Sequence, residues 1–388
     1  MAIERVAYVA FEPFPNAKGS GTRIGQMLRA LVGSGREVVL LTLPGRGAGE
    51  LPPGVEHRAL PVFRGNFLER ALAFRHRVAR ELHALRPHAI HFRGIFEGQA
   101  AMAYAERHPG CTTIFEVNGL PSVELPYHYP AVGQSLLLLD RLRRCEQALL
   151  LEVDAAVTQS HTTLAYLRGR RLPAATPSFV IPNGAVVPPS RDPAPSGPPT
   201  VLYAGTLTPW QGVAELLMAA RRCNRERELR FVLAGPIRRR WRGRLERVIR
   251  RLRVEDAVEL TDALPREALA ERVAAARICV APLRRDRRNE AQGCSPIKLF
   301  EYLAAGRPTV VTDLPCTREI IGPERGVLLH APRPKAIAEA LLGLLDDPDR
   351  AEALGRAGRA WVEAHATWDR RRAALVDAYA SLESAARG

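Results

Sequence analysis

Lysine is almost absent from this chain of 388 residues, and so are long apolar runs and paired cysteines. Of the 56 basic residues only three are lysines, at positions 18, 298 and 335. No run approaches the ~18 apolar residues that a membrane-spanning helix needs, so the sequence predicts none. The six cysteines are dispersed and include no Cys-x-x-Cys pair. We therefore expect reduced thiols, neither a disulfide framework nor a structural zinc site.

The amino terminus carries charged residues before its first apolar stretch. Glu4 and Arg5 precede a short apolar run within residues 1–9, whereas a secretory signal has a longer apolar region. The pattern predicts a first β-strand and no signal peptide, and we expect a cytoplasmic protein.

The chain is strongly basic, with a net charge of +15 and a pI of about 10.3. Such a surface attracts anions, including nucleic acids, anionic lipid headgroups and nucleoside diphosphates. Arginine runs at 238–240 and 370–372 lie within helical patterns, and both a solvated helix face and an anion-binding surface stay open for them. No zinc-finger spacing, aromatic RNA-binding signature or basic tail accompanies the charge, so we expect no nucleic-acid partner.

Short β-branched runs alternate with longer helical patterns through nearly the whole length. This alternation predicts α/β architecture with parallel sheets covered by helices on both faces. The expected strands lie at 5–9, 37–41, 89–92, 112–115, 155–158, 178–181, 200–203, 230–233, 257–260, 278–281 and 309–311.

A proline-rich segment interrupts the alternation near residue 190. Prolines at 188, 189, 193, 195, 198 and 199 break both periodicities, which is typical of a stiff linker. The sequence therefore predicts two doubly wound, Rossmann-like domains, at 1–187 and 188–366, with a helix at about 367–388 completing the first. In such sheets ligands bind beyond the carboxyl ends of the strands, so we expect the site in a cleft between the domains.

The most informative segment is Gly293–Pro308, GCSPIKLFEYLAAGRP. Ser295 suits an N-cap and Pro296 the first helical position, so a helix is expected to start here. A helix N-terminus with free N–H groups can bind a phosphate, and Lys298 would add a positive charge in the first turn. Glu301 shares a face with Lys298 and could accept hydrogen bonds from a ribose diol. An ordinary capped helix with an exposed Lys–Glu pair is the alternative.

This segment resembles the donor-binding signature of glycosyltransferase family 4, in a variant form Ser-Pro-x-Lys-Leu-Phe-Glu-Tyr. Other segments resemble the family in the same order: 180–184, 202–207, 231–235 and 279–283, and Thr367–Trp368 before the last helix. The resemblance implies a GT-B fold, a nucleotide-sugar donor, an acceptor bound by the first domain, retention of anomeric configuration and no metal or other cofactor. It also implies donor-binding residues: Gly19, Gly21, Gly205, Thr206, Gln211, Cys294, Ser295, Pro296, Lys298 and Glu301.

Three positions depart from the family pattern. Gly293 stands where many members carry a glutamate, Thr206 replaces the usual arginine, and Gln211 replaces the usual lysine. The two missing cations normally neutralise the leaving diphosphate. We expect Lys298 to replace them, with Arg23, Arg284, Arg285 or Arg288 as possible helpers.

In the first domain, 18–23 follows the first strand and opens a helix, where glycines let the backbone approach a phosphate. Arg93 and Glu116 end two later strands and are expected to point into the cleft. Glu116 falls where relatives carry a catalytic-site histidine, so we predict Glu116, Arg93 and Lys298 as catalytic residues. His88 is expected to be structural, whereas His91 could be structural or could point into the cleft.

The helix expected at 67–85 combines arginines with an apolar stripe. It could rest on an anionic membrane and meet a lipid-linked acceptor, or simply pack on the sheet. We therefore expect a glycan, lipid-linked or small-molecule acceptor. Two other functions stay open: a sugar-nucleotide epimerase on the same fold, which the Ser-Pro-x-Lys motif disfavours, and a catalytically weak regulatory subunit that keeps the donor pocket.

Overall fold

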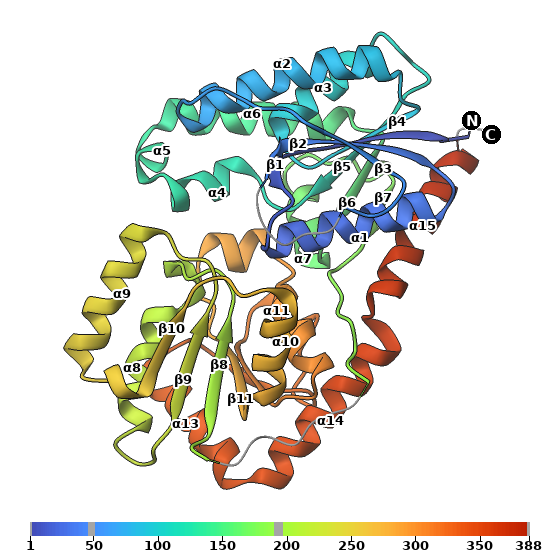
Figure 1. Cartoon of the computed structure of the whole chain (residues 1–388). Helices are drawn as coiled ribbons and strands as arrows, with labels where there is room; N and C mark the ends of the chain where they lie inside the picture. The colour runs from blue at the N-terminus through green and yellow to red at the C-terminus, as the bar shows by residue number, and fades with distance from the viewer. Residues whose placement is uncertain (1, 46–50, 190–196, 386–388) are drawn as a thin grey trace. The chain divides into compact units, whose positions relative to one another are not determined.

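The computed structural model describes residues 2–45, 51–189 and 197–385, and the side chain of Arg240 also lies outside the description. These residues form two compact units, each built on one parallel sheet (Figure 1). The N-terminal unit comprises Met1–Pro182, Ala291–Cys294 and Arg371–Gly388, and the C-terminal unit comprises Asn183–Glu290 and Ser295–Arg370. Within the described ranges, no helix is long and apolar enough to cross a membrane.

The N-terminal sheet has seven strands in the order β3-β2-β1-β4-β5-β6-β7, all paired in parallel. The strands are β1 (Arg5–Phe14), β2 (Glu37–Pro44), β3 (Val55–Ala59), β4 (Ala89–Phe92), β5 (Thr112–Val117), β6 (Ala155–Thr158) and β7 (Ser178–Val180). The helices are α1 (Gly19–Gly33), α2 (Phe67–Leu85), α3 (Ile95–Ala105), α4 (Pro121–His128), α5 (Pro130–Gln134), α6 (Leu136–Glu152) and α7 (His161–Arg168).

The C-terminal sheet has six parallel strands in the order β10-β9-β8-β11-β12-β13. The strands are β8 (Thr200–Ala204), β9 (Arg230–Ala234), β10 (Val258–Thr261), β11 (Ile278–Ala281), β12 (Thr309–Thr312) and β13 (Val327–Leu329). The helices are α8 (Val213–Cys223), α9 (Arg239–Leu252), α10 (Arg266–Ala275), α11 (Ile297–Ala304), α12 (Pro315–Arg318), α13 (Pro334–Asp346) and α14 (Pro348–His365). The last helix of the chain, α15 (Trp368–Ala385), belongs for most of its length to the N-terminal unit. Short turns lie at Pro209–Gln211, Glu255–Ala257 and Arg287–Gln292.

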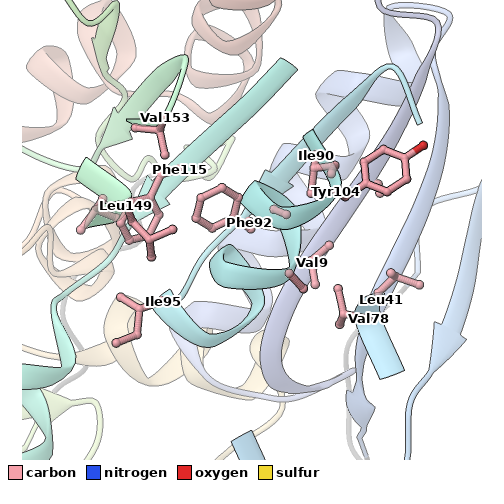
Figure 2. Close-up of a cluster of buried hydrophobic side chains, with 14 of the residues drawn as sticks. Val9, Leu41, Val78, Ile90, Phe92, Ile95, Tyr104, Phe115, Leu149 and Val153 are labelled. Atoms are coloured by element: carbon pink, nitrogen blue, oxygen red, sulfur yellow. The ribbon is translucent and has the colours of Figure 1, made fainter. Parts of the chain in front are cut away.

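Helices cover both faces of each sheet, which explains why the central strands are apolar throughout rather than alternating. Figure 2 shows the core of the N-terminal unit, where Val9, Phe92 and Phe115 from the strands meet Val78 of α2 and Leu149 of α6. Phe92 and Phe115 stack with ring centroids 4.9 Å apart. The α/β expectation of two Rossmann-like sheets is confirmed.

The last helix, α15, packs onto the N-terminal unit through polar contacts. The Tyr379 hydroxyl lies 3.0 Å from His91 Nδ1. Arg36 donates to Glu383 Oε1 at 2.9 Å, and the Ile3 backbone N–H donates to the same oxygen. Because these contacts join residues more than 280 positions apart, the end of the chain completes the first unit.

Three local features differ from the sequence expectations. The edge strands β3 and β13 were not predicted, because each is short and only partly buried and carries no strong β-pattern. The sequence at 133–151 has the pattern of one continuous helix, but the structure breaks it into α5 and α6 at Ser135, whose side chain caps α6 by accepting from the Leu138 N–H at 3.3 Å.

Candidate active site

The C-terminal unit brings two glycine turns together where β8 and β9 end. Gly205 has φ +139° and Gly235 φ +151°, both in the region that favours glycine. A Cβ on Gly235 would lie 2.1 Å from the Gly205 carbonyl oxygen, and one on Gly205 would lie 2.8 Å from Lys298 Nζ. A side chain at position 235 would collide with backbone, and one at position 205 would be strained and would have to displace the end of Lys298.

Lys298 is held beside this turn by Tyr203 and Gln211. Its ammonium donates to the Tyr203 hydroxyl at 2.9 Å and to Gln211 Oε1 at 2.8 Å, and it lies 4.0 Å from the centre of the Tyr203 ring. The Tyr203 hydroxyl in turn lies 2.9 Å from the Thr206 carbonyl oxygen. These contacts orient the ammonium through neutral groups that do not cancel its charge. Tyr203, which sequence reasoning missed, is buried inside β8, where it looks like an ordinary core residue.

The helix α11 starts one residue later than its sequence suggested. It runs from Ile297, with Pro296 as the flanking residue, and Ser295 does not cap it. Instead Ser295 Oγ accepts from the Asn183 N–H at 3.1 Å, and Asn183 Nδ2 donates to the Ser295 carbonyl oxygen at 2.6 Å. The expectation that Ser295 caps the helix is wrong, because its hydroxyl accepts from the N–H of Asn183, a residue distant in sequence.

Glu301 lies one turn after Lys298 on α11 and is partly buried. Burial raises the pKa of the Glu301 carboxyl, and the positive charges of Arg266 and Lys298 offset part of that rise. The next residue, Tyr302, accepts a hydrogen bond from the Ala204 N–H at 2.7 Å and so ties α11 to the end of β8. The fold thus places Lys298, Glu301, Gly205 and Gln211 around one end of β8.

The segment before this helix belongs to the N-terminal unit. Gln292 is fully buried, accepts from the Leu120 N–H at 2.8 Å and donates to Glu124 at 2.7 Å. Gly293 has φ +79°, and a Cβ there would lie 2.9 Å from Thr162 Cγ2. A glutamate at position 293 would therefore be strained, which explains one departure from the family pattern. Cys294 is partly buried and is the last residue of this segment.

The other arginines proposed as helpers are engaged elsewhere in the unit. Arg284 pairs with Glu215 at 3.4 Å. Arg285 pairs with Glu290 and donates to two backbone oxygens, at Asp313 and His330. Arg288 lies over the Trp210 ring, 5.8 Å from its centre. Of the proposed cations of this unit, Lys298 contacts Gln211 and approaches Gly205.

In the N-terminal unit, Glu116 is the centre of a buried polar network. Its carboxylate accepts from Arg23 Nε at 2.6 Å and from the Tyr8 hydroxyl at 2.7 Å, and lies 3.1 Å from His91 Nε2 and 3.5 Å from Arg93 Nε. Burial by itself would raise the pKa of Glu116, but the charges of Arg23 and Arg93 outweigh it and hold that pKa well below its usual value.

This geometry differs from the expectation that Glu116 and Arg93 point into an open cleft, because both residues are buried. The two carboxylate oxygens of Glu116 already contact Arg23, Tyr8 and His91. The arrangement favours a structural carboxylate, and its catalytic role stays a prediction. Arg23 donates to Glu116 and to the Ile181 carbonyl oxygen. These contacts favour a structural role over the expected role of helping Lys298 to bind a diphosphate.

Arg93 connects this network to two further acids. It lies 3.1 Å from Glu12, which is one-third exposed. Glu97, in the first turn of α3, accepts from the Phe11 N–H at 3.1 Å, and its Oε2 has no hydrogen-bond partner among the described residues. Burial raises the pKa of Glu97 to about 7, against the lowering effect of the Phe11 N–H. Sequence reasoning missed Glu97, because one glutamate in a helix carries no signal.

His88 is structural, as expected: its Nδ1 accepts from the N–H groups of Glu4 and Arg5, both at 3.2 Å. The glycine loop opens α1, with Gly19 as its exposed first residue and Gly21 buried. A Cβ on Gly21 would lie 2.4 Å from the Asn16 carbonyl oxygen, so Gly21 is needed for a close backbone turn. Within the described ranges no group of three His, Cys, Asp or Glu side chains could hold a metal ion.

Two family profiles cover most of the chain between them. The profile described as Glycosyltransferase Family 4 matches residues 17–187, and that described as Glycosyl transferases group 1 matches residues 189–361. The second match includes Gly205, Gln211, Lys298 and Glu301. The chain belongs to the GT-B glycosyltransferases.

Curated relatives of this GT-B glycosyltransferase are similar over part of their length. A GDP-mannose-dependent monoacylated alpha-(1-6)-phosphatidylinositol monomannoside mannosyltransferase of Corynebacterium glutamicum is 33% identical over 33% of this chain and 34% of its own. A GDP-mannose-dependent alpha-(1-6)-phosphatidylinositol monomannoside mannosyltransferase of Mycobacterium tuberculosis is 29% identical over 46% of each chain. The matches therefore span less than half the length of these relatives.

Solved structures share the whole fold. A sucrose-phosphate synthase from Thermosynechococcus elongatus superposes with a TM-score of 0.82 at 22% identity, over 98% of this chain and all of that one. HepE of Anabaena, solved with UDP-glucose, has a TM-score of 0.76 at 14% identity, over 97% and 99%. WaaG, a glycosyltransferase involved in lipopolysaccharide biosynthesis, has a TM-score of 0.71 at 16% identity, over 95% and 98%.

Proposed function

We propose that this chain transfers a sugar from a nucleoside-diphosphate sugar to an acceptor, with retention of configuration and without a metal ion. Lys298 is the group that carries the proposal. Its ammonium is held at a fixed point beside the Gly205 turn by Tyr203 and Gln211, at 2.9 and 2.8 Å. A cation beside a glycine turn beyond a parallel strand suits a diphosphate, because the backbone can approach the phosphates closely and the ammonium adds positive charge there.

The proposed catalytic role of Lys298 is to stabilise the charge that develops on the leaving diphosphate. As the sugar–phosphate bond breaks, negative charge develops on the leaving diphosphate, and a preorganised cation stabilises it more than the ground state. Lys298 would therefore substitute for the arginine and the lysine that Thr206 and Gln211 replace. Glu301, one turn along α11, would accept hydrogen bonds from the ribose hydroxyls. Support for this donor class comes from HepE, which was solved with UDP-glucose, and from relatives named as GDP-mannose-dependent enzymes.

The acceptor would bind the N-terminal unit and is a glycan or a lipid-linked glycan, as in building a surface polysaccharide. The relatives named for phosphatidylinositol mannosides support the lipid-linked form. Part of the apolar stripe of α2 packs in the core, where Ala71, Phe74 and Val78 are buried. A better contact is the start of α6, where Leu136 and Leu137 are 81% and 64% exposed. Exposed paired leucines are unusual on a free surface and suit a peripheral contact with a bilayer.

The test is isothermal titration of GDP-mannose and UDP-glucose into the wild-type chain and into Lys298→Met. Loss of one charged hydrogen-bond donor should weaken diphosphate binding by about 1.5–3 kcal/mol, roughly 10- to 150-fold. Lys335→Met is the matched control, because Lys335 is an exposed lysine on α13 paired with Glu339 at 3.6 Å. Equal affinities of the two variants would contradict the site assignment.

A transfer assay then separates the enzyme from its alternatives. Nucleoside diphosphate release that depends on an added acceptor supports transfer. Conversion of the donor without an acceptor would indicate an epimerase, and binding without either reaction a regulatory subunit.

A further inference from the structure

The helix α9 has a composition unlike the rest of the chain. Seven of its fourteen residues are arginine, against 53 of 388 in the whole sequence, and its single acidic residue is Glu246. A preference for arginine over lysine throughout the chain does not explain this clustering. The helix is about 21 Å long at 1.5 Å per residue.

One face of α9 is already used by the fold. Leu245, Val248 and Leu252 pack against the core of the C-terminal unit, and Ile249 is buried. Figure 1 shows the helix beside α8 on the outer side of this unit. Because α9 lies against the domain along its apolar side, only the opposite face is available to a partner.

That opposite face carries Arg244, Arg247, Arg250 and Arg251, all exposed. Arg244 lies over the Trp241 ring, 5.7 Å from its centre, and Arg247 donates to the Gly243 carbonyl oxygen of its own helix. None of the four forms an ion pair with another residue in the described ranges. By contrast Arg242, nearer the flank, pairs with Asp262 at 2.6 Å. The chain therefore neutralises the flank of α9 and leaves its outer face positive.

We propose that the outer face of α9 is a docking surface for a bilayer containing anionic phospholipids. Four like charges on one straight helix face match a plane of negative headgroups, and each arginine near such a surface strengthens binding about fivefold. Nucleic acid fits less well. The one aromatic ring of the segment is occupied by Arg244, which leaves none for stacking on bases, and a helix packed along its length cannot enter a groove.

The proposal goes beyond the proposed transfer reaction and can fail without it. The full-length chain is sedimented with phosphatidylcholine vesicles, with and without phosphatidylglycerol, at low and high salt. The variant replaces Arg244, Arg247, Arg250 and Arg251 with glutamine. The matched control makes the same change at four other exposed arginines without ion pairs in the described chain: Arg221, Arg222, Arg225 and Arg350.

We expect the wild type to bind only the anionic vesicles, less at high salt. The α9 variant should bind them at least about tenfold more weakly while the control keeps most of its affinity, since per-arginine effects of about fivefold multiply. Equal weakening of both variants would assign the effect to net charge and overturn the docking surface. Absence of wild-type binding, or tighter binding to polyuridylate than to the vesicles, would overturn it as well. Unchanged melting temperatures show that both variants are folded.

Discussion

Replacing Glu116 by glutamine is expected to destabilise the N-terminal unit strongly. The carboxylate is fully buried and pairs with Arg23 at 2.6 Å, and the side chains of Arg23 and Arg93 are 1% and 3% exposed. Glutamine keeps the shape but removes the charge, so buried Arg23 loses the carboxylate charge that it pairs with, whereas Arg93 keeps its pair with Glu12. Removing one partner of a buried ion pair costs about 3–5 kcal/mol.

Hydrogen exchange of the β4 and β5 amides measures this cost within the N-terminal unit. Glu37→Gln is the matched control, because Glu37 pairs with Arg5 at 2.8 Å but both are about half exposed. Glu37→Gln should lower the free energy of unfolding by less than about 1 kcal/mol. If Glu116→Gln instead kept the protection of the wild type and lost only transfer activity, the structural interpretation would be refuted and a catalytic carboxylate favoured.

The same carboxylate predicts a dependence of stability on pH. Its pKa is held well below the ordinary 4.5 in the folded chain. A group whose pKa is lower when folded stabilises the fold above the unfolded value. This contribution should be complete above about pH 5 and be lost as the pH falls below 4.5 toward the folded pKa. Glu116→Gln should show no such loss.

Two further substitutions test neighbouring features. Glu97→Gln should stabilise the chain at pH 8 by up to about 3 kcal/mol. The pKa of Glu97 is about 7 in the folded chain and 4.5 in the unfolded chain, so ionisation between these values favours the unfolded state. The gain should grow from pH 4.5 to 7 and vanish below, which urea midpoints at several pH values measure; a gain independent of pH would contradict it. Gly205→Ala should cost about 1–3 kcal/mol and displace Lys298, since it strains the φ of +139° and meets Nζ. Gly243→Ala, with open space around it in α9, is the control and should stabilise by up to about 1 kcal/mol. Equal melting temperatures of the two glycine variants would argue against a close approach at Gly205.

Hydrophobic periodicity and turn residues were enough to predict the two sheets and most of their strands. The runs at 112–115 and 278–281 are short, apolar and flanked by helical patterns, and buried parallel strands have that signature because both their faces are covered. The edge strands β3 and β13 escaped prediction for the converse reason, since an edge tolerates polar and exposed side chains.

The motif at 293–308 predicts donor-site residues from the sequence alone, because Lys298 and Glu301 lie close in sequence and share one helix. What holds Lys298 lies far away in sequence. Tyr203 and Gln211 meet it across 95 and 87 residues, and only the folded chain decides such a contact.

The sequence by itself determined the alternation of strands and helices, the glycine turns and the residues of the motif, because each depends on local backbone preference and burial pattern. Only the tertiary structure decided which charges are cancelled. Glu116 follows a strand end, as a cleft residue should, yet Arg23 from α1 and Arg93 after β4 enclose it. Lys298 looks like a surface lysine in the sequence, yet neutral partners fix its charge beside Gly205. Burial and ion pairing arise from residues distant along the chain, and one-dimensional patterns do not contain them.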